Sequence, residues 1–411
     1  MRRGCSSLIV LVVVLAGTVG CQSARSPRPF EPATAPLPEV ARELALPDVS
    51  RIDDAAPQPI DVAPGPYYQL TAEECRNLAC TNASAALLID SVATDKPDPF
   101  PFLKSHSSAD KLRRITAKNL SNEARLRTAG AALELYYRLQ EAELLADVLA
   151  ASQAEVDKLV ESGKVMADRG FTESADYWKL RQQQIELRAE RAKLQNGIRR
   201  MNVELKVILR LDATAGRILP VDAIRVDPEM LDVDRAVRVG LAGRPDLQTL
   251  RDLIKGLDAS TVAAVRQTFA GLVPPLGAIT AATRVISPGF RAIFPMLADG
   301  DVEGLRRQLQ LHLADREREV AKDLRATVDE WHTQRELVGV ARSRQALDAE
   351  RVRELGVKKA KGASVETEYR RALIDKLTAD ANAIREAVKW KQIDVRARRE
   401  MGLLCGANGC R

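Results

Sequence analysis

Apolar residues recur every seven positions between residues 180 and 208, in a stretch that is otherwise mostly charged. The repeating positions are Leu180, Leu187, Leu194, Met201 and Ile208. This spacing places the apolar side chains on one stripe of a helix and is typical of a coiled-coil seam. At about 1.5 Å per residue, a segment of roughly forty residues forms a rod of about 60 Å. The pattern therefore predicts a long helix that packs lengthwise against other helices.

The same segment occurs a second time in the chain. Residues 170–211 align without a gap on residues 362–403, at a constant offset of 192 positions. A further long helical pattern precedes each copy, from about 108 or 122 to 168 and from 302 to about 355. An internal repeat of this size predicts two similar units, each with two long helices.

A matched turn joins the two long helices of each unit. Gly170 and Gly362 occupy the same position in the two copies, and Thr172 and Ser364 follow them. Glycine readily adopts a positive φ, and a hydroxyl side chain can cap the helix that follows. We therefore expect each unit to be an antiparallel hairpin that reverses at its glycine.

Capping residues mark the start of each unit. Thr71 and Glu74 form a capping box, which predicts a helix from there to about Asp95. In the second unit Asp232 or Asp234 can cap the corresponding helix. The fold is therefore predicted to be mainly α, with two repeats of long antiparallel, coiled-coil-like hairpins.

The patterns divide the chain into six parts. These are a signal peptide (1–20), a linker that begins with a lipidated cysteine and is rich in proline (21–66), helical repeat 1 (67–211), a linker (212–230), helical repeat 2 (231–404) and a cysteine-containing tail (405–411).

The first residues have the pattern of a secretory signal. Arg2 and Arg3 precede the apolar run 8–17, and small residues lead from there to Cys21. The segment 18–21 resembles a bacterial lipobox, which implies cleavage before Cys21 and lipid attachment to its thiol. The alternative is an ordinary secreted chain with an unpaired cysteine at this position.

Composition argues against nucleic-acid binding and against catalysis. The net charge of +6 is the balance of 62 basic and 56 acidic residues, so the predicted surface mixes both signs. We find no groove-reading motif or aromatic-basic platform for nucleic acid. The three histidines are scattered, and no phosphate loop, nucleophile elbow or metal-ligand spacing appears. We therefore expect no catalytic residues, no metal site and no cofactor.

Two units of this kind behind a lipoprotein-like signal resemble the TolC-type outer-membrane efflux factors. The opening helices at 70–75 and 231–236 are similar to that family's first helix, and the two glycine turns are similar to its hairpin tips. Its "RPDL" segment is matched by Arg244, Pro245, Asp246 and Leu247.

The resemblance implies a homotrimer that forms a passive periplasmic conduit of a multi-component exporter. It also implies an outer-membrane location through the lipid anchor, and contact of the hairpin tips with a periplasmic adaptor and an inner-membrane pump. The family's membrane strands are expected to be reduced or absent, because the spans 84–170 and 245–362 show no segments of about ten alternating residues. Any contribution to a barrel would have to come from residues near 91–108 and 269–297. The alternatives are a non-conducting, lipid-anchored helical scaffold or, with less support, a surface adhesin.

The same resemblance implies how the cysteines are paired. In the family, the opening helix and the end of the last helix lie close together, which implies that Cys75 and Cys80 bond to Cys405 and Cys410 in either order. A metal site built from all four thiolates remains open. So does a bond between Cys405 and Cys410 that leaves the other two reduced.

Overall fold

Long helices dominate the described chain. The structure, a computed structural model, describes residues 67–94, 108–170, 174–212, 214–226, 230–272 and 302–405, which all lie in one unit, Pro64–Arg411. Its elements are β1 (Tyr67–Leu70), α3 (Ala72–Thr81), α4 (Ser84–Thr94), α5 (Ser108–Asp168), α6 (Ser174–Leu209), β2 (Arg217–Pro220), α7 (Val233–Gly243), α8 (Pro245–Lys255), α9 (Val262–Leu272), α12 (Val302–Ala360) and α13 (Glu366–Glu400).

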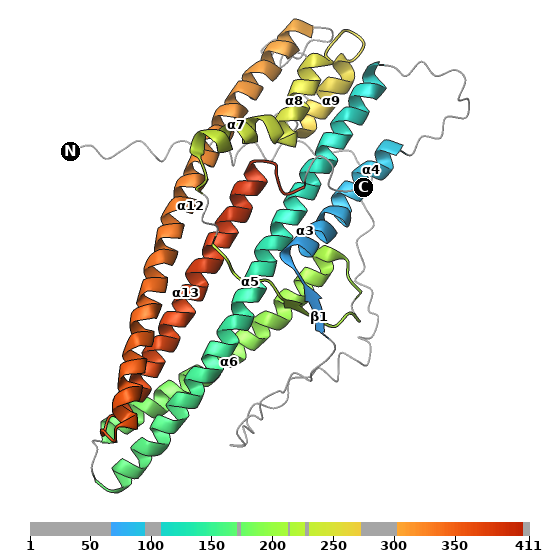
Figure 1. The fold of residues 1–411 in the computed structure, drawn as a ribbon. Helices are drawn as coiled ribbons and strands as arrows, with labels where there is room; N and C mark the ends of the chain where they lie inside the picture. The colour runs from blue at the N-terminus through green and yellow to red at the C-terminus, as the bar shows by residue number, and fades with distance from the viewer. Residues whose placement is uncertain are drawn as a thin grey trace, which may run out of the picture. The chain divides into compact units, whose positions relative to one another are not determined.

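The long helices form two antiparallel hairpins, α5–α6 and α12–α13, and their turns lie at the same end (Figure 1). Neighbouring helices pack in the order α12, α13, α5, α6. Helices α5 and α12 end at Asp168 and Ala360, and α6 and α13 begin at Ser174 and Glu366. Both pairs of boundaries are 192 residues apart, as the repeat predicts. The predicted mainly helical fold with two hairpin repeats is confirmed.

The packing of α13 explains why its buried residues are small. This helix lies against α12 on one side and α5 on the other. Alanines supply many of its buried positions (Ala372, Ala379, Ala381, Ala383, Ala387 and Ala397). Because alanine adds little bulk, two long neighbours can approach the same helix closely. On α6 the seven-residue seam is half-buried, and the fully buried line lies beside it at Ile198, Leu205 and Leu209.

Two short strands pair the linker with the start of repeat 1, and the sequence patterns missed both. β1 and β2 pair in parallel, with Tyr67 opposite Arg217 and Leu70 opposite Pro220. Just after β2, the Asp222 carboxylate accepts hydrogen bonds from the Ala72 amide at 2.5 Å and the Tyr136 hydroxyl at 2.9 Å. The linker 212–230 is therefore tied to the first repeat rather than being a simple spacer.

The opening helix of repeat 1 is shorter than expected. Its Thr71–Glu74 capping box is present, but the predicted single helix to Asp95 is divided into α3 and α4. Asn82 ends α3, and its side-chain amide donates to the Leu209 carbonyl oxygen at 2.8 Å, at the end of α6. This tertiary bond favours a break that the local sequence does not require.

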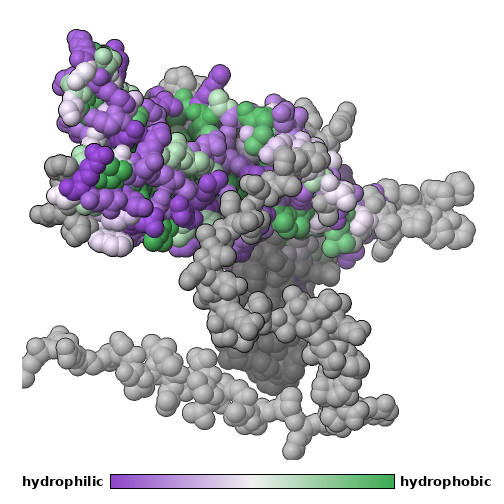
Figure 2. Space-filling model, turned by 90° about the horizontal axis from the view of Figure 1, so that it is seen from below, coloured by the Kyte–Doolittle hydropathy of each residue, from purple (hydrophilic) through white to green (hydrophobic). Residues whose placement is uncertain are grey.

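Helices α7, α8 and α9 lie at the end of the hairpins away from the turns (Figure 1). Asp232 is the N-cap of α7 and accepts from the Arg235 amide at 2.6 Å. Seen from below, hydrophilic residues cover most of the described surface, with separate hydrophobic patches among them (Figure 2). Among the described residues, no helix has the length and apolar character needed to span a bilayer. Most of the segments 91–108 and 269–297 lies outside the described residues.

Candidate functional site

Both predicted hairpin glycines adopt the conformation that a tight reversal needs. Gly170 has φ +72° and Gly362 has φ +85°, values that strain residues with a side chain. The predicted hydroxyl cap is wrong at the second turn. There Val365 is the N-cap of α13 and makes no side-chain capping bond, so Ser364 stands one position too early. Thr172 lies outside the described residues.

The "RPDL" segment forms an elbow between two helices. Arg244 ends α7 and precedes α8, and Pro245 takes the first position of α8, where its missing N–H needs no partner. The Arg244 guanidinium donates to both oxygens of Asp246, each at 2.9 Å. Leu247 is fully buried against α7 and α12. The segment therefore fixes the angle at which α8 leaves α7.

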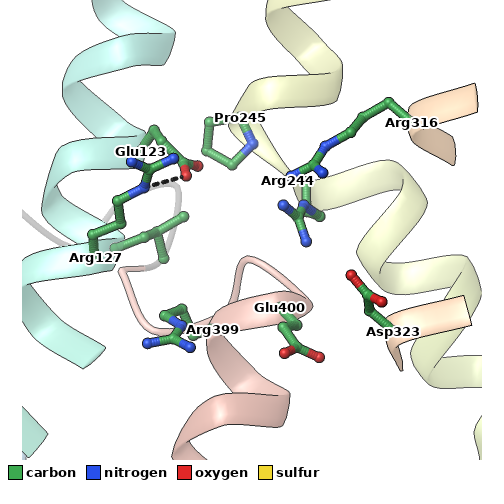
Figure 3. Close-up of a pocket in the computed structure, with 9 residues that line it drawn as sticks. Glu123, Arg127, Arg244, Pro245, Arg316, Asp323, Arg399 and Glu400 are labelled. Carbon is green, nitrogen blue, oxygen red and sulfur yellow. Dashed lines mark hydrogen bonds and ion pairs between the residues drawn. The ribbon is translucent and has the colours of Figure 1, made fainter. Parts of the chain in front are cut away.

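A polar cavity of about 370 Å³ lies beside this elbow. Its lining comes from α5, the α7–α8 elbow, α12 and α13, and comprises Glu123, Leu126, Arg127, Arg244, Pro245, Arg316, Asp323, Arg399 and Glu400. Figure 3 shows these side chains around one space, with Arg127 and Glu123 joined by an ion pair. The first and second repeats meet here.

Each arginine of the cavity already has a carboxylate partner. Arg316 on α12 donates to Asp246 at 3.1 Å and to Glu319 at 2.5 Å. Arg127 pairs with Glu123 at 2.8 Å, and Arg399 on α13 pairs with Glu134 on α5 at 3.2 Å. The arrangement joins helices from both repeats, and its balanced charges give it no marked preference for an anion or a cation.

Two carboxyl groups here have shifted pKa values, in opposite directions. Burial would raise the pKa of Asp246, but the hydrogen bonds and charges of Arg244 and Arg316 hold it below its ordinary value. Burial raises the pKa of Glu400, even though the Thr327 hydroxyl donates to it at 2.8 Å. Asp246 is therefore a strongly paired anion, whereas burial disfavours the charged form of Glu400.

The sequence identified only part of this site. Arg244, Pro245, Asp246 and Leu247 were found through the family motif. Arg316, Arg399 and Glu400 were missed, because each lies in a long charged helix and no local sequence pattern distinguishes it from solvent-exposed neighbours.

A disulfide joins the two ends of the described fold. Cys80 on α3 is bonded to Cys405, which follows α13, across 325 positions of sequence. Cys75 is a free, fully buried thiol, so the expected bond from this residue is not formed. It points into the core of repeat 1, where burial raises its pKa to about 12. Cys410 and Cys21 lie outside the described residues.

The disulfide also excludes a site built from all four thiolates, since two of the sulfurs are bonded to each other. Within the described ranges, no group of three or more cysteine, histidine or acidic side chains is placed to hold a metal ion.

Comparisons with known proteins agree with this architecture. No protein-family model matches the sequence, and no curated protein matches it significantly. Among solved structures, the MtrE outer membrane channel of Neisseria gonorrhoeae in its open state matches with a TM-score of 0.55 at 11% identity, over 80% of this chain and 88% of that one. The Campylobacter jejuni CmeC outer membrane channel matches with a TM-score of 0.54 at 10% identity, over 80% and 85%.

A membrane protein from Pseudomonas aeruginosa gives a TM-score of 0.51 at 10% identity, over 72% of this chain and 70% of that one. At these identities the likeness concerns the fold. The described chain thus has the fold of outer-membrane channels, as the TolC-type resemblance predicted.

Proposed function

We propose that this chain is the outer-membrane component of a multi-component exporter and acts as a passive conduit without catalysis. The observation that carries the proposal is the pair of matched helical hairpins, in the fold of outer-membrane channels over about four-fifths of the chain. Energy for transport comes from an inner-membrane pump. An adaptor protein contacts the hairpin tips at Gly170 and Gly362.

The conduit is formed by three copies of the chain. Support comes from exposed apolar residues on α6, which the single chain leaves uncovered. Trp178 and Ile185 are seven positions apart on one exposed stripe, which continues at Val203 and Val207, the latter 71% exposed. Such a stripe resembles a coiled-coil seam that lacks its partner helix. A second copy of the chain covers it.

The chain is held at the outer membrane by a lipid on Cys21, and residues 22–66 connect this anchor to the helices. Ten prolines in this stretch favour an extended spacer. Mass spectrometry of the mature N-terminal peptide tests the anchor, and finding Cys21 unmodified would contradict lipid attachment.

Two measurements on the detergent-extracted full chain test the conduit. Light scattering is expected to give the mass of three copies, and planar bilayers are expected to show single-channel conductance. Val203→Glu with Val207→Glu should reduce the mass to that of one copy, because glutamates on the stripe cannot be buried at a seam. Glu204→Lys, exposed beside the stripe, is the control and should leave the trimer intact.

The alternative is a lipid-anchored scaffold that does not conduct. Its support is the scarcity of strands in the described part of the chain, where β1 and β2 have four residues each, together with an aromatic content of only 4%. A stable trimer without conductance would favour the scaffold over the conduit.

A further inference from the structure

The internal repeat provides a matched comparison for each hairpin tip. Helix ends and turn glycines coincide at the 192-residue offset, and Tyr177 corresponds to Tyr369. The two turns therefore make the same demands on the backbone, and the tips can be compared position by position.

The tips differ in charge. In chain order, Glu161, Met166, Ala167, Arg169 and Trp178 of the first tip correspond to Arg353, Lys358, Lys359, Lys361 and Arg370 of the second. The first tip exposes apolar side chains, with Val165 and Met166 each nearly half exposed. At four of these five positions the second tip has a basic residue where the first has an apolar or acidic one, whereas Arg169 and Lys361 are both basic.

Part of this basic charge serves the hairpin itself. Lys359 pairs with Glu366 at 2.6 Å and lies over the Tyr369 ring, 4.9 Å from its centre. Arg370 pairs with Glu155 on α5 at 3.0 Å, which holds the second tip against the first hairpin.

The contacts described above leave Lys358 and Lys361 of the second tip without an explanation. Both are exposed, and neither side chain has an acidic partner within the described part of the chain. A cation at a helix C-terminus is stabilised by the helix dipole. That effect alone does not account for Lys358, since α5 ends at the matching position with no basic residue in its last turn. Arg169 matches Lys361, but it stands next to Asp168, whereas Lys361 stands next to Ala360.

We propose that the second hairpin tip binds an acidic segment of a protein partner through Lys358 and Lys361, a basic pair that the first tip lacks because Met166 stands at the position of Lys358. This inference rests on the proposed function, in which the tips contact an adaptor, and adds the chemistry of that contact. Opposite charges that face each other across an interface set its register and speed association.

A protein fits these tips better than an anionic membrane does. Polybasic membrane contacts use clusters of about four to eight lysines and arginines. Here the proposed contact has only Lys358 and Lys361. The first tip at the same end balances Glu161 and Asp168 with Lys164 and Arg169, so it adds no net positive charge. A partner with separate acidic and apolar areas matches both tips at once.

The test uses the full chain in detergent and three designed helical-hairpin probes of equal length. Their loop-side surfaces carry glutamate, glutamine or lysine, and their affinities are measured by fluorescence anisotropy at low and high salt. The acidic probe should bind about tenfold more tightly than the neutral one at low salt, and the preference should shrink as salt screens the charges. Vesicles with anionic lipid are measured in parallel.

Lys358→Glu with Lys361→Glu should abolish the preference for the acidic probe. Arg169→Glu is the matched control, because Arg169 holds the position of Lys361 in the first tip, and it should leave the preference unchanged. Equal affinities for the acidic and neutral probes, no binding of the acidic probe, an equal loss in the control, or stronger binding to anionic vesicles would each overturn the inference.

These outcomes are independent of the conduit test. A conducting trimer that ignores the acidic probe would overturn the inference alone. A non-conducting trimer that binds the probe would overturn the conduit and leave the acidic contact standing.

Discussion

Asp246 receives hydrogen bonds from arginines on two different elements, Arg244 at the elbow and Arg316 on α12. Its side chain is only 19% exposed, so solvent screens these pairs weakly. Asp246→Asn removes the negative charge and leaves both arginines unpaired at this point. We expect a loss of about 2 kcal/mol in the free energy of unfolding, measured by denaturant titration.

The lowered pKa of Asp246 also predicts how the stability loss in Asp246→Asn depends on pH. The pKa of Asp246 is lower in the folded chain than its ordinary value, so its stabilising effect is complete above about pH 4 and is lost as the pH falls through the folded pKa. The difference between the native protein and Asp246→Asn should therefore shrink in acid. Asp323→Asn, an exposed carboxylate on the same cavity, should change stability little at any pH.

The contribution of Glu400 to stability changes with pH in the opposite direction. Because burial raises its pKa, the folded chain binds this proton more tightly than the unfolded chain, and stability rises as the pH falls toward about 4. Glu400→Gln should raise the thermal midpoint at pH 7, since the amide oxygen still accepts from Thr327 without a buried charge. An equal gain at pH 4 would contradict this account, and Glu354→Gln, exposed on α12, should have no effect.

Close packing between α7 and α12 depends on the absence of one side chain. A Cβ on Gly240 would overlap the Leu324 Cδ1 atom and would lie 3.4 Å from the Glu400 carbonyl oxygen. Gly240→Ala should cost about 1–3 kcal/mol, because Leu324 must leave its place in a packed core. Gly197→Ala on α6, where a Cβ has nothing within 4 Å, should instead stabilise by up to about 1 kcal/mol. Calorimetry of both variants would show the opposite signs, and a gain for both would contradict the contact.

Whether the sequence revealed an element depended on its length. The long helices α5, α6, α12 and α13 span many turns, so their apolar stripes and matched ends could be read directly. β1 and β2 have four residues each, too few for an alternating pattern to be distinguished from chance. The break at Asn82 is made by a bond to Leu209, 127 positions away, which no local pattern can reveal.

At the scale of the whole molecule, the repeat predicted how each half folds but not how the halves join. Glu123, Arg316 and Glu400 reach one cavity from three different helices, and the bonds of Arg316 to Asp246 and of Thr327 to Glu400 exist only after the helices are packed. The disulfide could be predicted only in part. Family likeness brought α3 and the chain end together, but only the packing shows that Cys80 lies beside Cys405 while Cys75 points into the core.

The Cys80–Cys405 bond joins the first repeat to the end of the second, and its stabilising effect should be large. A cross-link that closes a long loop removes many conformations of the unfolded chain, and loss of such a bond typically costs about 2–5 kcal/mol. Cys80→Ser with Cys405→Ser should therefore lower the denaturation midpoint, and a reductant should lower it in the native protein but not in the double variant. Under native conditions Cys75 should resist alkylation, because its thiol is fully buried with a pKa of about 12. If complete reduction left the midpoint unchanged, the contacts of Leu404 with the core of repeat 1 would already hold the two repeats together without the bond.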